Sequence, residues 1–561
     1  AALLANTTAA NNTAIGYASL GANTTGTDNT AIGESTLAGT TTGNRNTGFG
    51  RRALMTNTTG TQNVSVGYLA LYSNTTASNN TAVGDSALFA NTTAANNTAV
   101  GFEALLDNTT GAQNTSVGFR SLYNNTTASN NTALGQDALY TNTTGASNVA
   151  LGHSTLTANT TASNNTAVGK SALTANTTGA ENVAVGREAL LANTTGAGNV
   201  AIGKDALDAN TTASNNVAIG LQALTANTTG DLNTAVGKSA GASVTTGVQN
   251  TLIGALAGDS LSDADFNVAV GQDALAIDSL GSRSVAIGRR SLYTQNFTSA
   301  TDVYNTAVGF NSGYSITTGT GNTFVGGLTG DAVTTATSNT AVGHNSLRAI
   351  CGNGNTSMGN HNLQFCTGDQ NTSFGLGSGY QVTSGDNNVL IGYEAGRTGS
   401  PGGAITTADN TLCLGDERIT ASHVQVDWTV ASDQRDKTDF TALDLGLDFV
   451  KALAPVTYKW DKRSKYGDKT ADDYDLNAQT PDGTHKEDWL DIGFKAQEVQ
   501  ALEEAAGYTT EAKKNLTVST TGDGKQMGLQ YSKFVPILVK ALQELSAKND
   551  ALEARLTTLE G

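Results

Sequence analysis

Ser432 and Lys437 are the residues of this 561-residue sequence whose types and spacing best fit a catalytic nucleophile and its general base. They begin and end the segment 432–437, Ser-Asp-Gln-Arg-Asp-Lys, which also contains Asp433 and Arg435. A hydroxyl is a weak nucleophile until a base takes its proton, and a lysine can take it only as a neutral amine. Burial or a nearby cation can lower a lysine pKa enough for this role. On spacing alone a polar linker is the simpler interpretation, so the flanking elements must decide.

The composition changes at this segment. Charged residues make up 9% of residues 1–431 and 31% of residues 432–561, and 55 of the 64 glycines lie in the first part. The absence of a three-residue glycine period excludes collagen, and an apolar content of 38% excludes a disordered polyelectrolyte. No apolar run is long enough for a transmembrane helix. A sequence pI near 4.7 argues against a nucleic-acid partner. We therefore expect no nucleic-acid binding and no membrane insertion.

The first part of the chain is an internal repeat. The motif Asn-Thr-Ala-Val/Ile-Gly recurs, and its glycine returns every 17 residues from Gly16 to Gly288. Further glycines continue the row less evenly from Gly309 to Gly415, which gives 24 repeats. This period predicts a mostly β protein, with a β-solenoid or β-roll shaft over residues 1–415 and a connector over 416–431. The loops that break the period, 296–304 and 399–408, are the expected places for receptor contact.

One repeat shows the expected packing. Thr81 and Val83 point to one face of an extended segment, and Ala82 points to the other. We expect Val83 and Leu88 to stack from coil to coil as the core. Ala82 then leaves room for close approach by a neighbour, including another chain. Gly84 permits a corner that a Cβ would obstruct.

Two asparagine rows run through the repeats, four residues before the glycine (Asn80) and seven after it (Asn91). Stacked coils repeat every ~4.8 Å, so equal positions should form amide ladders. Asparagine also suits corners because it tolerates the left-handed conformation. The Asn-Thr-Thr sequence is also an N-glycosylation acceptor. Threonine rows suit ice binding in principle, although threonine is also simply favoured in exposed strands.

Cysteine is scarce in this chain. Cys351 and Cys366 take nearly equivalent places in adjacent repeats, so stacking would bring their Cα atoms within disulfide range. A disulfide and two buried free thiols both remain open. The number and spacing of the cysteines do not suggest zinc, and we expect no metal and no cofactor.

The repeat resembles the Asn-Ser-Val-Ala-Ile-Gly motif of trimeric autotransporter adhesin heads over residues 12–415. Those heads are left-handed β-rolls that associate as trimers, so the resemblance implies a homotrimer. The repeat of this chain is longer than the repeat of those heads, which leaves the handedness of the solenoid and the shape of its coils open. Those adhesins end in an outer-membrane barrel, whereas this chain ends in a charged helix.

The sequence of 432–561 predicts a small α/β domain followed by a coiled coil. Residues 456–460 alternate like a strand, and 494–505 form a helical pattern. Apolar residues from Val535 to Leu559 are spaced alternately by 3 and 4, with Asn549 at an a position, where a polar residue fixes register. The pattern favours a coiled coil over 535–561 rather than an ordinary amphipathic helix, and the resemblances described here imply that it is trimeric.

The segment 432–437 matches the Ser-Asp-x-Arg-x-Lys motif that opens the intramolecular chaperone domain of phage tail fibres and tailspikes, the S74 peptidase family. Residues 458–460, 493–499 and 531–545 match further motifs in order, so the resemblance covers 432–561, with the chaperone proper over 432–534. It implies a domain that trimerises the shaft and is then released by cleavage between Ala431 and Ser432. Ser432 is the implied nucleophile and Lys437 the general base, with Asp433 and Arg435 in support. Such a peptidase turns over once, so the mature fibre is not an enzyme.

Two classes of function follow from these patterns. The first is a trimeric fibre of a virion that attaches to a glycan or protein on the host surface, after its chaperone has acted in the producing cell. The second is a secreted or cell-surface bacterial adhesin that uses the same chaperone. Ice binding ranks lower, because threonine is simply favoured in exposed strands. Polysaccharide degradation also ranks lower, because no repeat carries recurring paired acids for a glycosidase.

Overall fold

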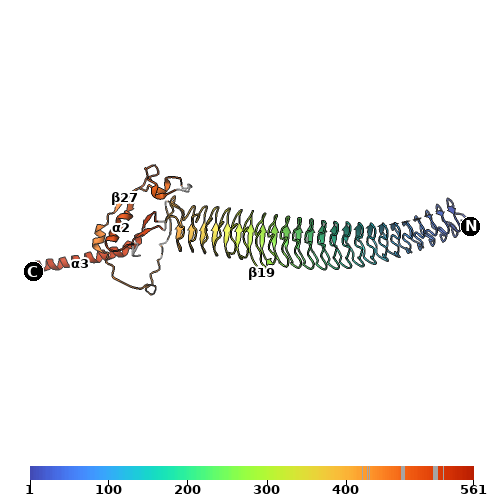
Figure 1. Cartoon of the computed structure of the whole chain (residues 1–561), viewed down its shortest axis with the longest axis horizontal. Coiled ribbons are helices and arrows are strands. Elements are labelled where there is room, and N and C mark those ends of the chain that lie inside the picture. The colour runs from blue at the N-terminus through green and yellow to red at the C-terminus, as the bar shows by residue number, and fades with distance from the viewer. Residues whose placement is uncertain (420, 426–427, 429, 469–473, 510–515, 522–523) are drawn as a thin grey trace. The chain divides into compact units, whose positions relative to one another are not determined.

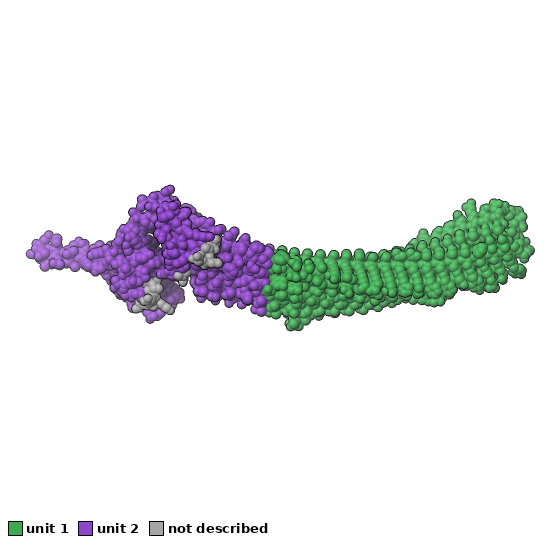
Figure 2. All heavy atoms as spheres, turned by 45° about the horizontal axis from the view of Figure 1, so that its top comes forward, with its two compact units in different colours: residues 1–322 green, residues 323–561 purple. Residues whose placement is uncertain are grey.

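The computed structural model describes residues 1–419, 421–425, 428, 430–468, 474–509, 516–521 and 524–561. The chain forms two compact units, Ala1–Asn322 and Thr323–Gly561, which Figure 2 shows in green and purple.

Short strands lying side by side make up the first unit (Figure 1). Their bounds are β1 (Thr13–Ile15), β2 (Thr30–Ile32), β3 (Thr47–Phe49), β4 (Val64–Val66), β5 (Thr81–Val83), β6 (Thr98–Val100), β7 (Thr115–Val117), β8 (Thr132–Leu134), β9 (Val149–Leu151), β10 (Thr166–Val168), β11 (Val183–Val185), β12 (Val200–Ile202), β13 (Val217–Ile219), β14 (Thr234–Val236), β15 (Thr251–Ile253), β16 (Val268–Val270), β17 (Gly281–Ser282), β18 (Val285–Ile287), β19 (Thr301–Asp302) and β20 (Thr306–Val308).

Neighbouring strands of this stack are parallel and offset by one repeat. Thr81 of β5 pairs with Val64 of β4 and with Thr98 of β6, so the register follows the sequence period. The main sheet has 24 strands, one for each repeat of the sequence. The prediction of a mostly β chain with a β-solenoid shaft is therefore confirmed.

Each strand ends at a glycine corner. Gly84 has φ +136, a conformation that L side chains rarely adopt. A Cβ at this position would also lie only 2.3 Å from the carbonyl oxygen of Gly101 in the next coil. The repeat glycine is thus required both by the backbone angle and by the close stacking of coils.

The predicted core is correct for Leu88 and wrong for Val83 and Ala82. Ala82 and Leu88 are fully buried, whereas Val83 lies on the outer face and is half-buried. The reason is the narrow interior, which one leucine per coil nearly fills. At Gly48, the equivalent of Ala82 two coils earlier, an added Cβ would already lie 3.3 Å from Leu37 Cδ1. Only a small residue fits there, so the larger β-branched residues turn outward.

Both asparagine rows form the predicted ladders. Asn80 donates its backbone N–H to Oδ1 of Asn63 in the preceding coil and its Nδ2 to the carbonyl of Ala94, each at 3.0 Å. Asn91 donates Nδ2 to Oδ1 of Asn74 and to the same carbonyl, again at 3.0 Å. These amides are fully buried. Since N-glycosylation modifies asparagine nitrogen, the folded solenoid keeps this acceptor out of reach.

The left-handed residues are not those of the ladder rows, contrary to expectation. Asn79, Ser86 and Leu88 have φ of 61°, 56° and 54°, and their equivalents repeat along the solenoid. A branched apolar residue such as Leu88 rarely adopts this conformation. Here its side chain fills the core, which offsets the unfavourable backbone.

Larger core residues are matched by glycines across the coil. Leu252 replaces the usual strand alanine, and the facing leucine positions are Gly241 and Gly258. A Cβ on these glycines would lie 2.6 Å from Cδ1 and 2.7 Å from Cδ2 of Leu252, respectively. In the second unit, a Cβ on Gly330 would lie 2.8 Å from the Phe324 ring. The total side-chain volume inside a coil is therefore maintained, although it shifts from the leucine positions to the strand position.

The second unit contains further solenoid strands and a small α/β region. The strands of the solenoid are β21 (Thr323–Val325), β22 (Thr340–Val342), β23 (Thr356–Met358), β24 (Thr372–Phe374), β25 (Val389–Ile391) and β26 (Leu412–Leu414). The α/β region contains η1 (Gln434–Asp436), α1 (Leu447–Ala452), β27 (Val456–Tyr458), η2 (Arg463–Lys465), η3 (Leu476–Ala478), β28 (Asp491–Gly493), α2 (Ala496–Ala505), β29 (Val518–Thr520), β30 (Met527–Leu529), η4 (Tyr531–Lys533) and α3 (Phe534–Glu560). The predicted strand and helix appear as β27 and α2, each slightly shorter than expected.

The α/β region has its own apolar core, made of Leu445, Phe449, Val499, Val518, Phe534 and Ile537. Two carboxylates tie its elements together. Buried Glu503 of α2 accepts the backbone N–H of Thr517 at 2.7 Å, and Glu544 of α3 accepts that of Leu447, the first residue of α1, at 2.8 Å. This core sets the first helix of the region against the base of the C-terminal helix.

We predict that the core around Leu252 can be converted to the arrangement of most other coils, in which a strand alanine faces two leucines. Leu252→Ala alone should cost about 2–5 kcal/mol through a cavity, and Gly258→Leu alone about 1–3 kcal/mol through overpacking. A Cβ on Gly258 would also lie 2.8 Å from Cδ1 of Leu261, which with Val244 replaces the usual asparagine row. The combined variant Leu252→Ala/Gly241→Leu/Gly258→Leu/Val244→Asn/Leu261→Asn should therefore recover most of this loss, because leucine adopts φ near 50° at the equivalent position of other coils, as at Leu224. Denaturant unfolding of the purified protein measures the coupling, and strictly additive losses would contradict it.

Candidate active site

A short turn brings the two candidate catalytic residues together. η1 spans Gln434–Asp436, and the backbone N–H of Lys437 closes it by donating to the carbonyl of Gln434. Ser432 therefore precedes the turn and Lys437 follows it. Nζ of Lys437 donates to Oγ of Ser432 at 2.5 Å. The structure thus places the amine in direct contact with the hydroxyl, as a nucleophile and base pair would require.

Asp433 and Arg435 pair with each other rather than with Ser432 or Lys437. Asp433 caps η1 by accepting the backbone N–H of Arg435 at 2.9 Å, and the Arg435 guanidinium binds the same carboxylate at 2.6 to 3.1 Å. Hydrogen bonds from Arg435 lower the pKa of the Asp433 carboxyl, and the same carboxylate raises the pKa of Arg435. The motif residues between the two ends therefore stabilise the turn that sets the distance between them.

The whole segment is exposed in the single chain. Ala431, Ser432 and Lys437 all lie on the surface, as do the residues between them. A lysine acts as a base only when its amine is neutral, and burial is a main way to favour that form. The contact between the two groups is present in one chain, whereas a dry environment around them has to come from further protein.

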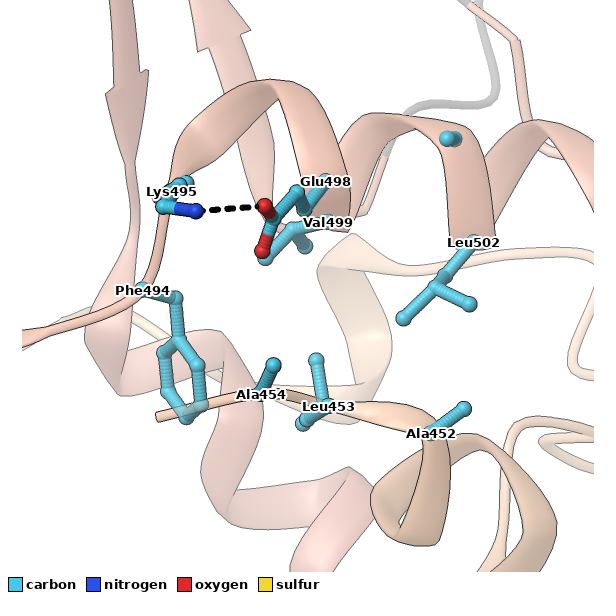
Figure 3. A pocket seen from close by; sticks show the side chains of 9 residues that line it. Ala452, Leu453, Ala454, Phe494, Lys495, Glu498, Val499 and Leu502 are labelled. Carbon is cyan, nitrogen blue, oxygen red and sulfur yellow. Dashed lines mark hydrogen bonds and ion pairs between the residues drawn. The ribbon is translucent and has the colours of Figure 1, made fainter. Parts of the chain in front are cut away.

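The α/β region also contains an apolar groove, which lies between α2 and the segment that follows α1 (Figure 3). Leu453, Phe494 and Leu502 line it, and its volume is about 290 Å³. Lys495 and Glu498 are paired with each other at 2.7 Å on its rim. The groove therefore offers apolar side chains at its floor, and the two charged groups on its rim are paired with each other.

The C-terminal helix α3 extends well past the core it anchors. Only Phe534, Ile537 and Ala541 near its start are buried. The heptad positions beyond them are exposed, with 67% of Leu542 and 59% of Leu556 accessible. Nδ2 of Asn549 donates to Oε1 of Glu553 at 3.2 Å on the helix surface. The predicted helix is present, and its apolar stripe is unpartnered in one chain; the coiled coil and its trimeric state stay predictions.

The outer face of the solenoid sheet is a second apolar surface. The residue before the repeat glycine is large and apolar in almost every coil, and the other outward strand residue is threonine or valine. Ile202, Ile219, Ile253 and Ile287 are among its exposed members. Extended apolar surfaces of this size mark interaction sites in soluble proteins.

The structure holds Cys351, Cys366 and Cys413 as free, buried thiols. Burial raises the pKa of Cys351 to about 12 and that of Cys366 to about 11. This corresponds to the second of the two alternatives left open by the sequence.

The described ranges contain neither a candidate metal centre nor a helix that could span a membrane. Within them, no group of three or more His, Cys, Asp or Glu residues could hold a metal ion. Of the helices they contain, none is long and apolar enough to cross a membrane.

Comparison with known families agrees with the position of the site. The family model described as chaperone of endosialidase, Peptidase S74, matches residues 432–508. The match begins at Ser432 and includes η1, α1, the β27–β28 pair and α2. No curated protein matches the chain. The chain therefore combines a β-solenoid shaft with a chaperone domain of the S74 type, which begins at the candidate nucleophile.

We predict that the three thiols are slow to react in the folded protein. At pH 8 the raised pKa values keep the buried thiols protonated, so iodoacetamide should modify them much faster after unfolding than before. Mass measurement after alkylation in denaturant without reductant should show three modified cysteines. Modification of only one cysteine, rising to three with reductant, would reveal a disulfide and contradict the free-thiol arrangement.

Proposed function

We propose that the chain is a trimeric attachment fibre or spike of a virion, whose C-terminal domain assembles three chains and then cuts itself off between Ala431 and Ser432. The observation that carries this proposal is the contact between Ser432 and Lys437 at the first residue of the matched chaperone domain. The site lies where the repetitive, charge-poor part of the chain gives way to the charged part. Cleavage there would release the whole chaperone and leave the whole shaft.

The chemistry follows from the position of the nucleophile. Ser432 comes directly after the bond to be broken, so its Oγ would attack the carbonyl carbon of Ala431 through a five-membered ring. Lys437, as a neutral amine, would take the hydroxyl proton and return it to the departing amine of Ser432. The resulting ester between Ala431 and the Ser432 side chain would then be hydrolysed by water. The products are a shaft with a new carboxyl end and a chaperone with a new amino end.

Assembly would supply the environment that the single chain lacks. The exposed hydroxyl and amine would become a working pair once neighbouring subunits cover the segment and exclude water, since burial favours the neutral lysine. Such coupling would delay cleavage until the chains have trimerised, which is the useful order of events for a chaperone.

Two unpartnered apolar surfaces support the trimer. The heptad stripe of α3 suits a coiled coil, with Asn549 setting its register. The outer face of the solenoid sheet offers large apolar side chains in coil after coil, and a second and third copy of the same surface would cover them. Host attachment is then the role of the released shaft, with the receptor on its surface.

Cleavage is tested by denaturing electrophoresis of the 57.1 kDa chain. The wild type should give a shortened shaft and a released chaperone, whereas Ser432→Ala and Lys437→Ala should stay full length because each removes one half of the pair. Lys451→Ala is the matched control, since it removes an exposed lysine of α1 that takes no part in the site, and it should cut normally. Full-length bands for both the wild type and Ser432→Ala would refute self-cleavage.

Dependence of cleavage on assembly is tested on α3. Leu545→Glu should place charges in the heptad seam, prevent trimerisation and leave most of the chain uncut, whereas Ala554→Glu on the far side of the helix should do neither. Sedimentation of the uncleavable Ser432→Ala background gives the oligomeric state, and electrophoresis of the Ser432 background gives the cut fraction. Complete cleavage of a monomeric Leu545→Glu chain would contradict the coupling.

A further inference from the structure

One stretch of the solenoid departs from its repeat in a way that packing does not require. Five residues before the repeat glycine, most coils have Asn, Gln, Ser or another polar residue, or glycine. The backbone is left-handed there, and asparagine is among the residues that tolerate it best. In three consecutive coils this position holds Phe266, Arg283 and Tyr304, with φ of 60°, 64° and 55°. Two aromatic residues thus occupy a conformation that favours small polar ones.

Burial does not compensate these aromatic residues. Leu88 accepts a left-handed backbone because its side chain fills the core, whereas 41% of Phe266 and 59% of Tyr304 remain exposed. An unfavourable backbone that carries an outward side chain is a sign of selection for a surface function rather than for stability.

The departing side chains form one continuous strip. The Arg283 guanidinium carbon lies 4.9 Å from the centre of the Phe266 ring and 6.0 Å from that of Tyr304. Nε of Arg283 donates to Oδ1 of Asp302 at 2.8 Å, and the Tyr304 hydroxyl donates to Oδ2 of the same carboxylate at 3.4 Å. Both charged side chains remain about half exposed, 42% for Arg283 and 53% for Asp302.

An inserted segment holds the carboxylate in place. The repeat between Gly288 and Gly309 is longer than the repeats before it, and its extra length forms β19, which Figure 1 labels. β19 pairs with β17 in a small second sheet, where Asp302 lies opposite Ser282, the residue before Arg283. The strip is therefore supported by paired strands, and Asp302 and Tyr304 belong to the loop 296–304 that the sequence suggested for receptor contact.

We propose that Phe266, Arg283, Asp302 and Tyr304 bind pyranose units of a host-surface glycan. This inference rests on the proposed function as an attachment fibre and names the class of its receptor. Aromatic rings offer apolar surface to the C–H groups of a sugar, and an adjacent guanidinium and carboxylate offer donors and acceptors to neighbouring hydroxyls. The two rings are two coils apart, about 9.6 Å at ~4.8 Å per coil, a span that suits two linked sugars. The half-exposed Asp302 carboxylate beside the rings favours a glycan over a protein, because sugar hydroxyls can donate to it whereas aspartate is depleted at protein interfaces.

The test measures binding of the cleaved, trimeric fibre to an array of immobilised bacterial and animal oligosaccharides. The wild type should bind a subset of the array. Phe266→Asn/Tyr304→Asn, which restores the common residue type, should weaken that binding at least tenfold, as should Arg283→Asn. The thermal midpoint of the double variant should stay unchanged or rise, because asparagine suits the backbone better. Phe102→Asn/Phe119→Asn is the matched control, since it removes an exposed stacked aromatic pair elsewhere in the same unit and should leave glycan binding intact.

The outcomes separate this inference from the function it rests on. A cleaved trimer that binds no sugar on the array, or binds host cells only through protease-sensitive proteins, would overturn the glycan site alone. Undiminished binding by the double variant, or loss of binding together with a lowered midpoint, would also overturn it, the latter by showing a structural role. A chain that neither trimerises nor cleaves would instead refute the proposed function.

Discussion

Stacking of coils in register is the interaction on which the rest of this molecule depends. A coil contributes one short strand and cannot bury its apolar residues alone. Its leucine is covered only by the coils on either side, and its asparagine amides find their partners there too. The interior is about one leucine wide, so the strand residue that faces it must be small, such as alanine or Ser65, or else the facing leucines become glycine, as around Leu252. The regular period of the sequence is the length that brings each group onto its equivalent in the next coil.

The same regularity creates a problem during folding. Near-identical coils can pair in many wrong registers, and a sheet with few charges has little to discourage mispairing. A domain that holds three chains at a common end would remove much of that freedom, because each later coil then adds to a defined edge. Once the ladders are complete, nothing in the shaft needs the domain. The cleavage proposed between Ala431 and Ser432, just after the repeats, would fit this order of events.

Two levels of order are visible in the shaft. The glycine corner and the asparagine row that precedes it vary little, because each is in contact with its own copies. The buried leucine and the second asparagine row vary more, as at Gly258 and Leu261 of one coil. Outward positions vary widely, yet they follow rules of their own. Stacked rings such as Tyr72 and Phe89, 5.3 Å apart, and cross-coil pairs such as Arg120 with Glu103 join neighbouring coils on the surface. A surface residue that departs from the repeat therefore points to a function at that place, and the strip around Arg283 is the clearest case.

The sequence by itself determined the solenoid, its period and the asparagine ladders, because each depends on one repeat stacking on the next. The pairing of Ser432 with Lys437 was expected only from the resemblance to a family motif, since their spacing alone fits a polar linker equally well. Only the tertiary structure decided which strand residue faces inward. The alternation of Thr81, Ala82 and Val83 has two faces, and hydrophobicity alone favours the wrong one for the core, whereas the width of the coil favours the smaller residue opposite a leucine. The sequence also could not reveal the left-handed leucines, because they depend on backbone angles. It could not reveal the strip of Phe266, Arg283 and Tyr304 either, because these side chains meet only across coils. Burial of the thiols and the hydrogen bond between Glu544 and the first residue of α1 likewise arise from contacts between residues of different coils or elements, which spacing along the sequence does not record.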